Sequence, residues 1–410
     1  MLCCYTKSMG YKTYTCPIAR TCGGCEWLAV PYAIQLRRKQ EWIASVFANV
    51  IKQDCSQLDE IAGMQNAPTH FRHKAATPFA PGTQENIRYG FYARGTHHII
   101  PCQACLAENP QARKIFNKLA RVAEEWHIPA YNEDQSTGVL RHAIVRIGWK
   151  TNECLLVIVT SHRNFLHKEE FFHALHKACP GVTSAVQNIN NRKTNAMLGR
   201  QSHVVWGTGA MHDKLLGCLF EIGPQSFYQT NPAQTETLYQ RAIEAAGLRE
   251  RSRLLDAYCG TGTIGICAAS ALKQHKQTIQ VVGIDQTPDA IACAQRNARI
   301  NALQTSCRFV RTDATAYIKA ACCGNAPCHF DAVILDPPRA GSTPDFLESI
   351  SLLAPQRVIY VSCNVKTQLR DLDILRARGY RVTRILPVDM FPHTKHVECI
   401  VALSYVRVDG

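Results

Sequence analysis

The chain of 410 residues contains no apolar run long enough to cross a membrane. Its longest apolar stretches, such as residues 155–159, fall far short of the roughly 20 residues that a transmembrane helix needs. Residues 1–7 lack the apolar segment of a secretion signal. The chain also lacks internal repeats and low-complexity tracts. We therefore expect a cytoplasmic globular protein that does not enter a membrane.

Acidic residues are few compared with basic ones. The 32 Asp and Glu residues stand against 46 Lys and Arg, which gives a formal net charge of +14 at pH 7. Lys and Arg side chains that neutralise phosphates release counterions, so this excess favours a polyanionic partner. A merely basic protein is an equally good interpretation, because net charge reports on association and not on fold.

The chain divides by pattern near residue 225. Before this point, the sequence predicts helices over residues 33–52 and 111–125 and paired strands over residues 141–148 and 154–160. After it, apolar strand segments alternate with helical patterns, which predicts a mostly parallel, doubly wound sheet.

The expected fold class is therefore α/β, with a C-terminal Rossmann-like domain behind an N-terminal α+β part. The C-terminal domain is expected over residues 225–410. The N-terminal part is expected to comprise a cysteine-bearing region, residues 1–110, and a central α+β domain, residues 111–224. A chain of this length can bury a large core in more than one domain.

A glycine turn follows the first strand of the alternating region, at Gly260-Thr261-Gly262. Glycines let the backbone turn tightly beside a ligand, and the next strand ends in Asp285, an acid that can accept both ribose hydroxyls. On its own the turn is a weak signal, and an ordinary βα turn explains it about as well. Together the two features favour an adenosine-bearing cofactor.

The turn reads Gly-x-Gly and not Gly-x-Gly-x-x-Gly, so it makes little provision for a pyrophosphate. This favours S-adenosylmethionine over a dinucleotide. Asp313 follows the next strand, where an adenine contact would fall. An N-cap of the following helix is an equally good interpretation of Asp313.

Two further strands end in residues that suit covalent chemistry. Asp336-Pro337-Pro338 follows one apolar strand and resembles the motif of methyltransferases that act on exocyclic nitrogens, which need no nucleophile. The next strand ends at Cys363, however, which indicates carbon chemistry. Carbon 5 of uracil becomes nucleophilic once a thiolate has added to carbon 6, and a base must later remove the carbon 5 proton.

Glu398 is the candidate base, and its neighbour His396 could assist it. The alternatives are a solvated surface glutamate for Glu398, a structural hydrogen bond for His396 and a buried inert thiol for Cys363. The flanking Ser362 and Asn364 and the end of the strand argue against an inert thiol.

Three of the 20 cysteines form a C-x5-C-x2-C run at Cys16, Cys22 and Cys25, and a distant pair follows at Cys102 and Cys105. Such thiolates suit a four-thiolate iron–sulfur cluster or a zinc site, and the spacing alone does not select the metal. Most other cysteines lie singly among apolar residues, where we expect small core side chains. Cys3 and Cys4 are left over.

Long composite segments resemble the RNA uracil-5 methyltransferase family. They are Asp336-Pro337-Pro338-Arg339-Ala340-Gly341, the segment 358–367 around Ser362-Cys363-Asn364, the segment 389–398 and, as a third element, Ser226-Phe227-Tyr228-Gln229-Thr230-Asn231.

The resemblance implies S-adenosylmethionine as methyl donor, Cys363 as nucleophile and Glu398 as base. It also implies a set of residues that bind the cofactor or the target uracil, namely Gln229, Tyr258, Thr263, Asp285, Asp313 and Asp336. Thr263 stands where relatives often carry Asn, and Asp285 replaces the more usual Glu.

Iron–sulfur members of this family carry the same cysteine spacing. The resemblance therefore implies a [4Fe-4S] cluster with Cys16, Cys22, Cys25 and Cys105 as ligands. Segments such as 71–75 and 140–142 are similar to family segments near the RNA-binding face, which makes the central domain an expected RNA-binding domain.

The shorter arrangement, without a small β-barrel domain before the cysteines, resembles members that act on large-subunit ribosomal RNA. The expected substrate is therefore a uridine of 23S ribosomal RNA. The same chemistry on tRNA is the alternative, and an inactive RNA-binding or iron–sulfur sensing protein is a third possibility. We expect a monomer that binds RNA and not DNA.

Overall fold

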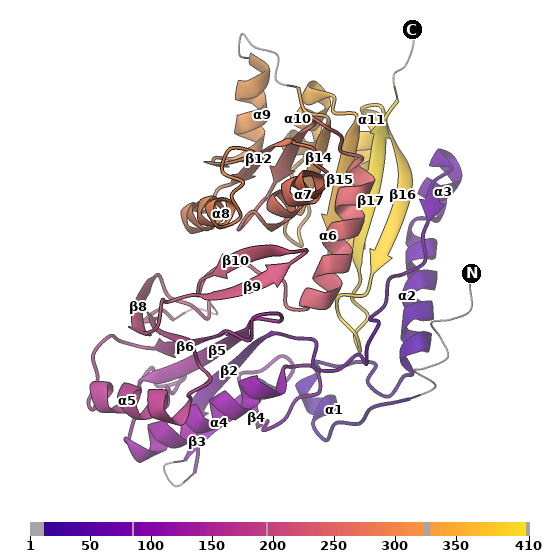
Figure 1. Cartoon of the computed structure of the whole chain (residues 1–410). Helices are drawn as coiled ribbons and strands as arrows, with labels where there is room; N and C mark the ends of the chain where they lie inside the picture. The colour runs from indigo at the N-terminus through magenta and orange to yellow at the C-terminus, as the bar shows by residue number, and fades with distance from the viewer. Residues whose placement is uncertain (1–11, 84–85, 194–195, 324–328, 407–410) are drawn as a thin grey trace.

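The computed structural model describes residues 12–83, 86–193, 196–323 and 329–406 (Figure 1). Cys3, Cys4 and the rest of the N-terminal segment 1–7 lie outside these residues. Within the described ranges, no helix has the length and apolar character of a membrane span.

An eight-stranded sheet forms the C-terminal half of the protein, in the order β1-β16-β17-β15-β14-β11-β12-β13. Neighbouring strands run parallel except where β17 pairs antiparallel with β15 and β16. The strands are β1 (Gln57–Leu58), β11 (Arg253–Ala257), β12 (Gln280–Asp285), β13 (Cys307–Arg311), β14 (Ala332–Leu335), β15 (Arg357–Ser362), β16 (Tyr380–Val388) and β17 (Glu398–Tyr405).

Helices cover both faces of this sheet, because its central strands are apolar throughout and bury both sides. One face packs against α6 (Pro232–Ala246), α7 (Thr263–Gln274) and α8 (Pro288–Ile300). The other packs against α9 (Ala314–Cys323), α10 (Pro344–Leu353) and α11 (Val365–Ala377), and also against α2 (Tyr32–Val46) and α3 (Ala48–Asp54). The predicted α/β fold with a mostly parallel, doubly wound sheet is confirmed.

A second sheet has seven strands, in the order β4-β3-β2-β5-β6-β7-β8. Its strands are β2 (Lys74–Pro81), β3 (Ile87–Tyr92), β4 (Ile99–Pro101), β5 (Leu140–Ile147), β6 (Cys154–Thr160), β7 (Ser184–Ile189) and β8 (Gln201–Trp206). Helices α4 (Pro110–Glu125) and α5 (Lys168–Ala178) pack on it. The hairpin β9 (Met211–Leu215) and β10 (Cys218–Ile222) lies between the two sheets in Figure 1.

The N-terminal segments do not stay together as one unit. The short helix α1 (Ala19–Cys22) precedes α2, and the predicted helix over 33–52 is divided at Phe47 into α2 and α3. Figure 1 shows these two helices alongside β16, and β1 pairs with β16 in parallel. Strands β2 to β4 instead share a sheet with β5 to β8, so this sheet contains strands from both sides of residue 110. The three-part division of the chain stays a prediction.

Candidate active site

The pairing of two interior strands of the eight-stranded sheet brings Cys363 and Glu398 together at one end of these strands. Strands β15 and β17 run antiparallel, and their last paired position joins Ser362 to Cys399. The next position of this register places Cys363, directly after β15, opposite Glu398, the first residue of β17. Beneath them, Gln368 donates through Nε2 to the carbonyl oxygens of Tyr360 (2.9 Å) and Cys399 (3.0 Å) and fixes the two strands together.

Asp336 joins the same edge from the neighbouring strand. It follows β14, whose last residue, Leu335, is aligned in parallel with Tyr360 of β15. Burial raises the pKa of the Asp336 carboxyl to about 7. Burial also raises the pKa of Glu398 to about 8, with the charge of Asp336 adding to the rise and Arg339 opposing it. The two carboxyl groups therefore share one poorly solvated site.

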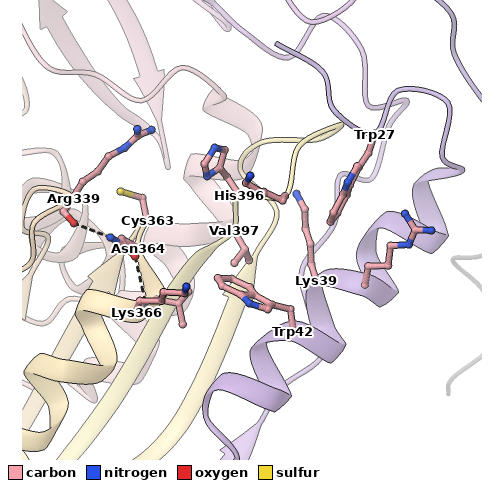
Figure 2. A pocket seen from close by; sticks show the side chains of 12 residues that line it. Trp27, Lys39, Trp42, Arg339, Cys363, Asn364, Lys366, His396 and Val397 are labelled. Carbon is pink, nitrogen blue, oxygen red and sulfur yellow. Dashed lines mark hydrogen bonds between the residues drawn. The ribbon is translucent and has the colours of Figure 1, made fainter. Parts of the chain in front are cut away.

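Arg339 is a further member of the site whose role the sequence did not reveal. Burial raises the pKa of the Cys363 thiol and so does the charge of Glu398, whereas the charge of Arg339 and its hydrogen bond to the thiol lower it. Figure 2 shows Arg339 beside Cys363. A guanidinium in this position stabilises a thiolate against the burial that disfavours it.

The turn that presents Cys363 is fixed on both sides. The backbone N–H of Asn364 donates to Ser362 Oγ (3.0 Å), which closes a tight turn around the cysteine. The Asn364 amide donates to the carbonyl oxygen of Arg339 (3.0 Å), as Figure 2 shows, and the same side chain caps α11. Ser362 and Asn364 thus orient the nucleophile and connect it to the loop after β14.

The glycine turn after β11 has the geometry of a ligand cradle. Gly262 has φ 78°, and a Cβ added there would lie 2.6 Å from the ring of Phe309. Gly260 has φ 53°, and a Cβ added there would meet no atom within 4 Å, so space lies open beside it. Asp285 accepts hydrogen bonds from the backbone N–H groups of Gly260 (3.1 Å) and Thr287 (2.8 Å), which places its carboxylate next to that space.

Tyr258 and Asp313 lie near this turn. Tyr258 adopts φ 62°, its hydroxyl is 2.8 Å from Ser342 Oγ, and its ring packs edge-on against Phe346. Asp313 is exposed and accepts from the backbone N–H of Ala316 (2.9 Å). The helix-capping interpretation of Asp313 is therefore seen in the structure, and its second oxygen accepts from Gln286 (2.7 Å).

Thr263 directly follows the turn, and a segment near Gln229 contacts the turn. Gln229 is partly buried in the segment between β10 and α6, where Thr261 Oγ1 donates to the carbonyl oxygen of Phe227 (3.4 Å). Thr263 begins α7, and its buried hydroxyl is 3.1 Å from the hydroxyl of Tyr239. Its hydroxyl thus has a partner within the protein.

The loop that leads to Glu398 is fixed by the N-terminal helix α2. The buried His393 donates its backbone N–H to Gln35 Oε1 (2.8 Å), and its Nε2 lies 2.7 Å from the carbonyl oxygen of Pro68. Lys39 of α2 pairs with Asp389 at the start of the loop. His396 is exposed and contacts the ring of Phe391 edge-on.

A cavity of about 200 Å³ is lined by the three cysteines of the N-terminal run and by Cys102 and Cys105. Burial raises the pKa of the Cys25 thiol to about 11, and the charges of Cys105, Cys22 and Cys16 add to the rise while Arg72 opposes it. The four predicted ligands are therefore close enough to act on one another. Cys102 instead donates its thiol to the carbonyl oxygen of Ala104 (3.1 Å).

Whether these residues fit a metal group depends on its size. In the part of the chain that the structure describes, no group of three or more His, Cys, Asp or Glu side chains is arranged to bind a metal ion. The cavity is nevertheless several times the roughly 30 Å³ that one water molecule occupies in the liquid. The buried Nε of Arg72, which lines it, has no hydrogen-bond partner. This donor and the four thiols fit an anionic, sulfur-rich group larger than one ion.

The chain matches one protein family along most of its length. Residues 31–406 match the family described as tRNA (Uracil-5-)-methyltransferase. An uncharacterised RNA methyltransferase of Clostridium acetobutylicum is 36% identical over 405 residues, which cover 98% of this chain and 85% of that protein. Another from Halalkalibacterium halodurans is 36% identical over 390 residues, which cover 95% of this chain and 82% of that protein.

Among solved structures, the chain resembles the tRNA (uracil-54, C5)-methyltransferase of Pyrococcus abyssi, which was crystallised in complex with S-adenosyl-L-homocysteine. The TM-score is 0.73 and the sequence identity 26%, over 93% of this chain and 85% of that one.

Proposed function

The chain belongs to the tRNA (uracil-5-)-methyltransferase family, and on this premise we propose that it methylates carbon 5 of a uridine in 23S ribosomal RNA with S-adenosylmethionine as donor. The observation that carries the chemistry of this proposal is the strand register that sets Cys363 opposite Glu398, with Asp336 and Arg339 beside them. The choice of 23S ribosomal RNA rests on the resemblance of the short cysteine-bearing arrangement to family members that act on that RNA. The match along the chain by itself supports an RNA methyltransferase of this family.

In the proposed reaction, the thiolate of Cys363 attacks carbon 6 of the target uracil and forms a carbon–sulfur bond. The electron pair of the 5,6 double bond moves so that carbon 5 becomes nucleophilic. Arg339 favours the thiolate over the thiol through its positive charge. S-Adenosylmethionine, when bound, would supply the methyl group of its sulfonium to carbon 5 and would leave as S-adenosylhomocysteine.

The carboxylate of Glu398 then removes the proton from carbon 5, the double bond returns, and the sulfur of Cys363 leaves. Burial raises the pKa of Glu398 to about 8, which makes its carboxylate a stronger base than an ordinary glutamate near neutral pH. Asp336 contributes by raising that pKa through its own charge. The two carboxyl groups therefore serve one deprotonation.

For the cofactor, we propose the glycine turn and the residues around it. The open space at Gly260 and the carboxylate of Asp285 next to it suit a ribose with two hydroxyls. Further contacts are proposed from the residues that the family resemblance implies, namely Gln229, Tyr258, Thr263, Asp313 and Asp336. In this proposal residues 225–410 form the catalytic domain and residues 111–224 the RNA-binding domain, and the protein acts as a monomer.

For the cysteine cavity, we propose a [4Fe-4S] cluster with Cys16, Cys22, Cys25 and Cys105 as ligands. The shared cavity and the unpartnered Nε of Arg72 support it. Pro392 also lines this cavity, and the backbone N–H of Trp27 donates to the carbonyl oxygen of His393 (2.9 Å). A cluster there would stabilise the loop that ends in Glu398, which makes its proposed role structural.

The substrate is tested by methylation of two unmodified RNA transcripts, 23S ribosomal RNA and tRNA, with S-adenosylmethionine. The proposal predicts 5-methyluridine in the ribosomal transcript, mapped to one position or a few. Methylation of tRNA alone would replace the substrate and keep the chemistry. RNA bound without 5-methyluridine in either transcript would favour the inactive RNA-binding protein.

A further inference from the structure

A cavity of about 570 Å³ opens beside Cys363 on the side facing α2. Figure 2 shows Cys363 and Arg339 on one side of it and Trp27 and Trp42 on the other, with His396 and Val397 between them. Pockets of this size bury ligands much larger than one pyrimidine ring. A target uracil at Cys363 would therefore leave room for neighbouring groups of the same strand.

The cavity is positively charged. Its lining includes the exposed cations Arg38, Arg339, Lys366 and Lys395, and no carboxylate is among its described lining residues. Lys39 also lines it, but its ammonium pairs with Asp389 and is fully buried. Lys395 forms a partly exposed ion pair with Glu26 at 3.5 Å, a contact that is weak enough to exchange for a phosphate. Arg38, Arg339 and Lys366 are exposed, and charge complementarity favours phosphates as the partners of these cations.

This cavity is also separate from the expected cofactor site. Its lining contains Cys363 and Arg339 but none of the residues around the glycine turn. Cys363 thus lines the cavity beside α2. A substrate strand in this cavity can reach the sulfur without entering the expected cofactor site.

The side chains of Trp27 and Trp42 both line this cavity. Helix α2 buries Tyr32, Gln35, Lys39 and Ile43, and Trp42 lies outside this stripe with 38% of its surface exposed. It shares a helix face with Arg38, four residues earlier. Trp27 is fixed by its backbone, because its carbonyl oxygen accepts from Gln35 Nε2 (3.0 Å), and the guanidinium of Arg38 lies over its ring at 5.8 Å.

We propose that Trp27 and Trp42 form a stacking surface for nucleobases that flank the target uridine, while Arg38, Lys366 and Lys395 contact the phosphates of that strand. The inference rests on the proposed function, since it assigns the strand to the same RNA whose uridine reaches Cys363. Base–aromatic stacking tolerates any sequence, because every base has a π face. The surface therefore positions single-stranded RNA and leaves the choice of uridine to other contacts.

The test compares variants in binding to unmethylated RNA, isolated from cells that lack this protein. All binding is measured in the Cys363→Ala background, so that no covalent bond contributes. Trp42→Ala is expected to raise the Kd for RNA by roughly 5- to 150-fold, the range for the loss of one base–aromatic stack. Trp42→Phe keeps an aromatic face and is expected to lose much less.

Tyr405→Ala is the matched control. Tyr405 is an aromatic residue with the same 38% exposure, at the opposite end of β17 from Glu398. It is expected to bind RNA as the unsubstituted background does. Equal Kd values for Trp42→Ala and this control would overturn the stacking surface.

A second measurement needs no aromatic variant and so does not depend on how Trp42→Ala folds. RNA containing 5-bromouridine is bound to the protein, irradiated with near-ultraviolet light and digested for peptide mapping. Cross-links on the peptides that contain Trp27 or Trp42 support the surface, and cross-links confined to other peptides overturn it.

The two levels of proposal fail in different ways. If the protein with Cys363 makes 5-methyluridine but Trp42→Ala binds RNA normally, only the stacking surface is wrong. If Trp42→Ala loses RNA binding but no 5-methyluridine forms in any RNA, the surface stands and the proposed function is wrong.

Discussion

Lys39 and Asp389 form an ion pair with no exposed side-chain surface, at 2.5 Å between Nζ and Oδ1. The ammonium also donates to the carbonyl oxygen of Phe391 (3.1 Å), and the hydroxyl of Tyr32 donates to the second oxygen of Asp389 (2.8 Å). The pair joins α2 to the loop that leads to Glu398. The N-terminal helix therefore belongs physically to the candidate active site.

Removal of Lys39 should destabilise the protein strongly. Lys39→Met leaves the carboxylate of Asp389 buried without its cation, a change that costs about 3–5 kcal/mol in proteins. Urea denaturation should show this loss. Arg37→Met, in the exposed Arg37–Glu41 pair of the same helix, serves as the control and should change stability by less than about 0.5 kcal/mol. Similar values for both variants would show that the buried pair contributes little.

Glu398→Gln should stop the reaction after methyl transfer. Glutamine cannot remove the carbon 5 proton, so methylated RNA should remain bonded to Cys363 as a complex that survives denaturing electrophoresis. Glu348→Gln removes an exposed carboxylate on α10 and should release product normally. Normal turnover by Glu398→Gln would assign the deprotonation to another group.

The raised pKa of Glu398 also predicts how stability depends on pH. The carboxyl group titrates near 4.5 in the unfolded chain and at about 8 in the folded protein, where burial opposes its charge. Between these values the folded state binds more protons, so this group makes the protein less stable as the pH rises from about 4.5 to about 8.

Glu398→Gln removes this titration. We therefore compare the melting temperatures of the variant and the unsubstituted protein at each pH. The difference, variant minus unsubstituted protein, should increase by roughly 2–6 °C from pH 5 to pH 9. Asp336 titrates in the same range and its charge acts on Glu398, so the difference reports the titration of the pair of carboxyl groups. A difference that stays constant over this range would contradict the raised pKa.

Cys25→Ser and Cys102→Ser should separate the cluster ligands from their neighbour. Both thiols line the same cavity, but only Cys25 belongs to the proposed ligand set, and Cys102 donates to a backbone carbonyl. Iron analysis and visible absorption of protein purified without oxygen should show loss of iron for Cys25→Ser and retention for Cys102→Ser. Stoichiometric zinc in the unsubstituted protein would overturn the iron–sulfur proposal.

Much of the C-terminal half could be predicted from local patterns. Apolar segments such as Ala332–Leu335 are buried on both faces, and each polar residue that follows such a strand lies at one edge of the sheet. The positions of Cys363, Asp336 and Asp285 follow from this rule alone. These positions could be predicted because the alternation of strands and helices is visible within short stretches of sequence.

Other features depend on contacts between distant segments. Strand β16 alternates poorly, with Arg381 and Arg384 exposed, and its place between β1 and β17 comes from long-range pairing. The predicted helix is divided at Phe47, whose ring is fully buried in the core. Lys39 reads as one more cation in a basic helix until Asp389, 350 residues later, is known to face it.

The site residues that the sequence did not reveal share this cause. Arg339 follows Asp-Pro-Pro directly, and only the fold places its guanidinium beside the sulfur of Cys363. Trp42 carried no distinctive signal, because a single large apolar side chain on a surface helix is ordinary.

The central claim is that the sulfur of Cys363 forms a bond to uracil, and a trapped complex tests it most directly. In RNA that carries 5-fluorouridine, the base cannot remove fluorine from carbon 5, so the adduct persists. Mass spectrometry of the digested complex should find the nucleotide on the peptide that contains Cys363. Cys363→Ala should give no adduct, and Cys322→Ala should give as much as the unsubstituted protein. An adduct on another residue, or one formed by Cys363→Ala, would contradict the account.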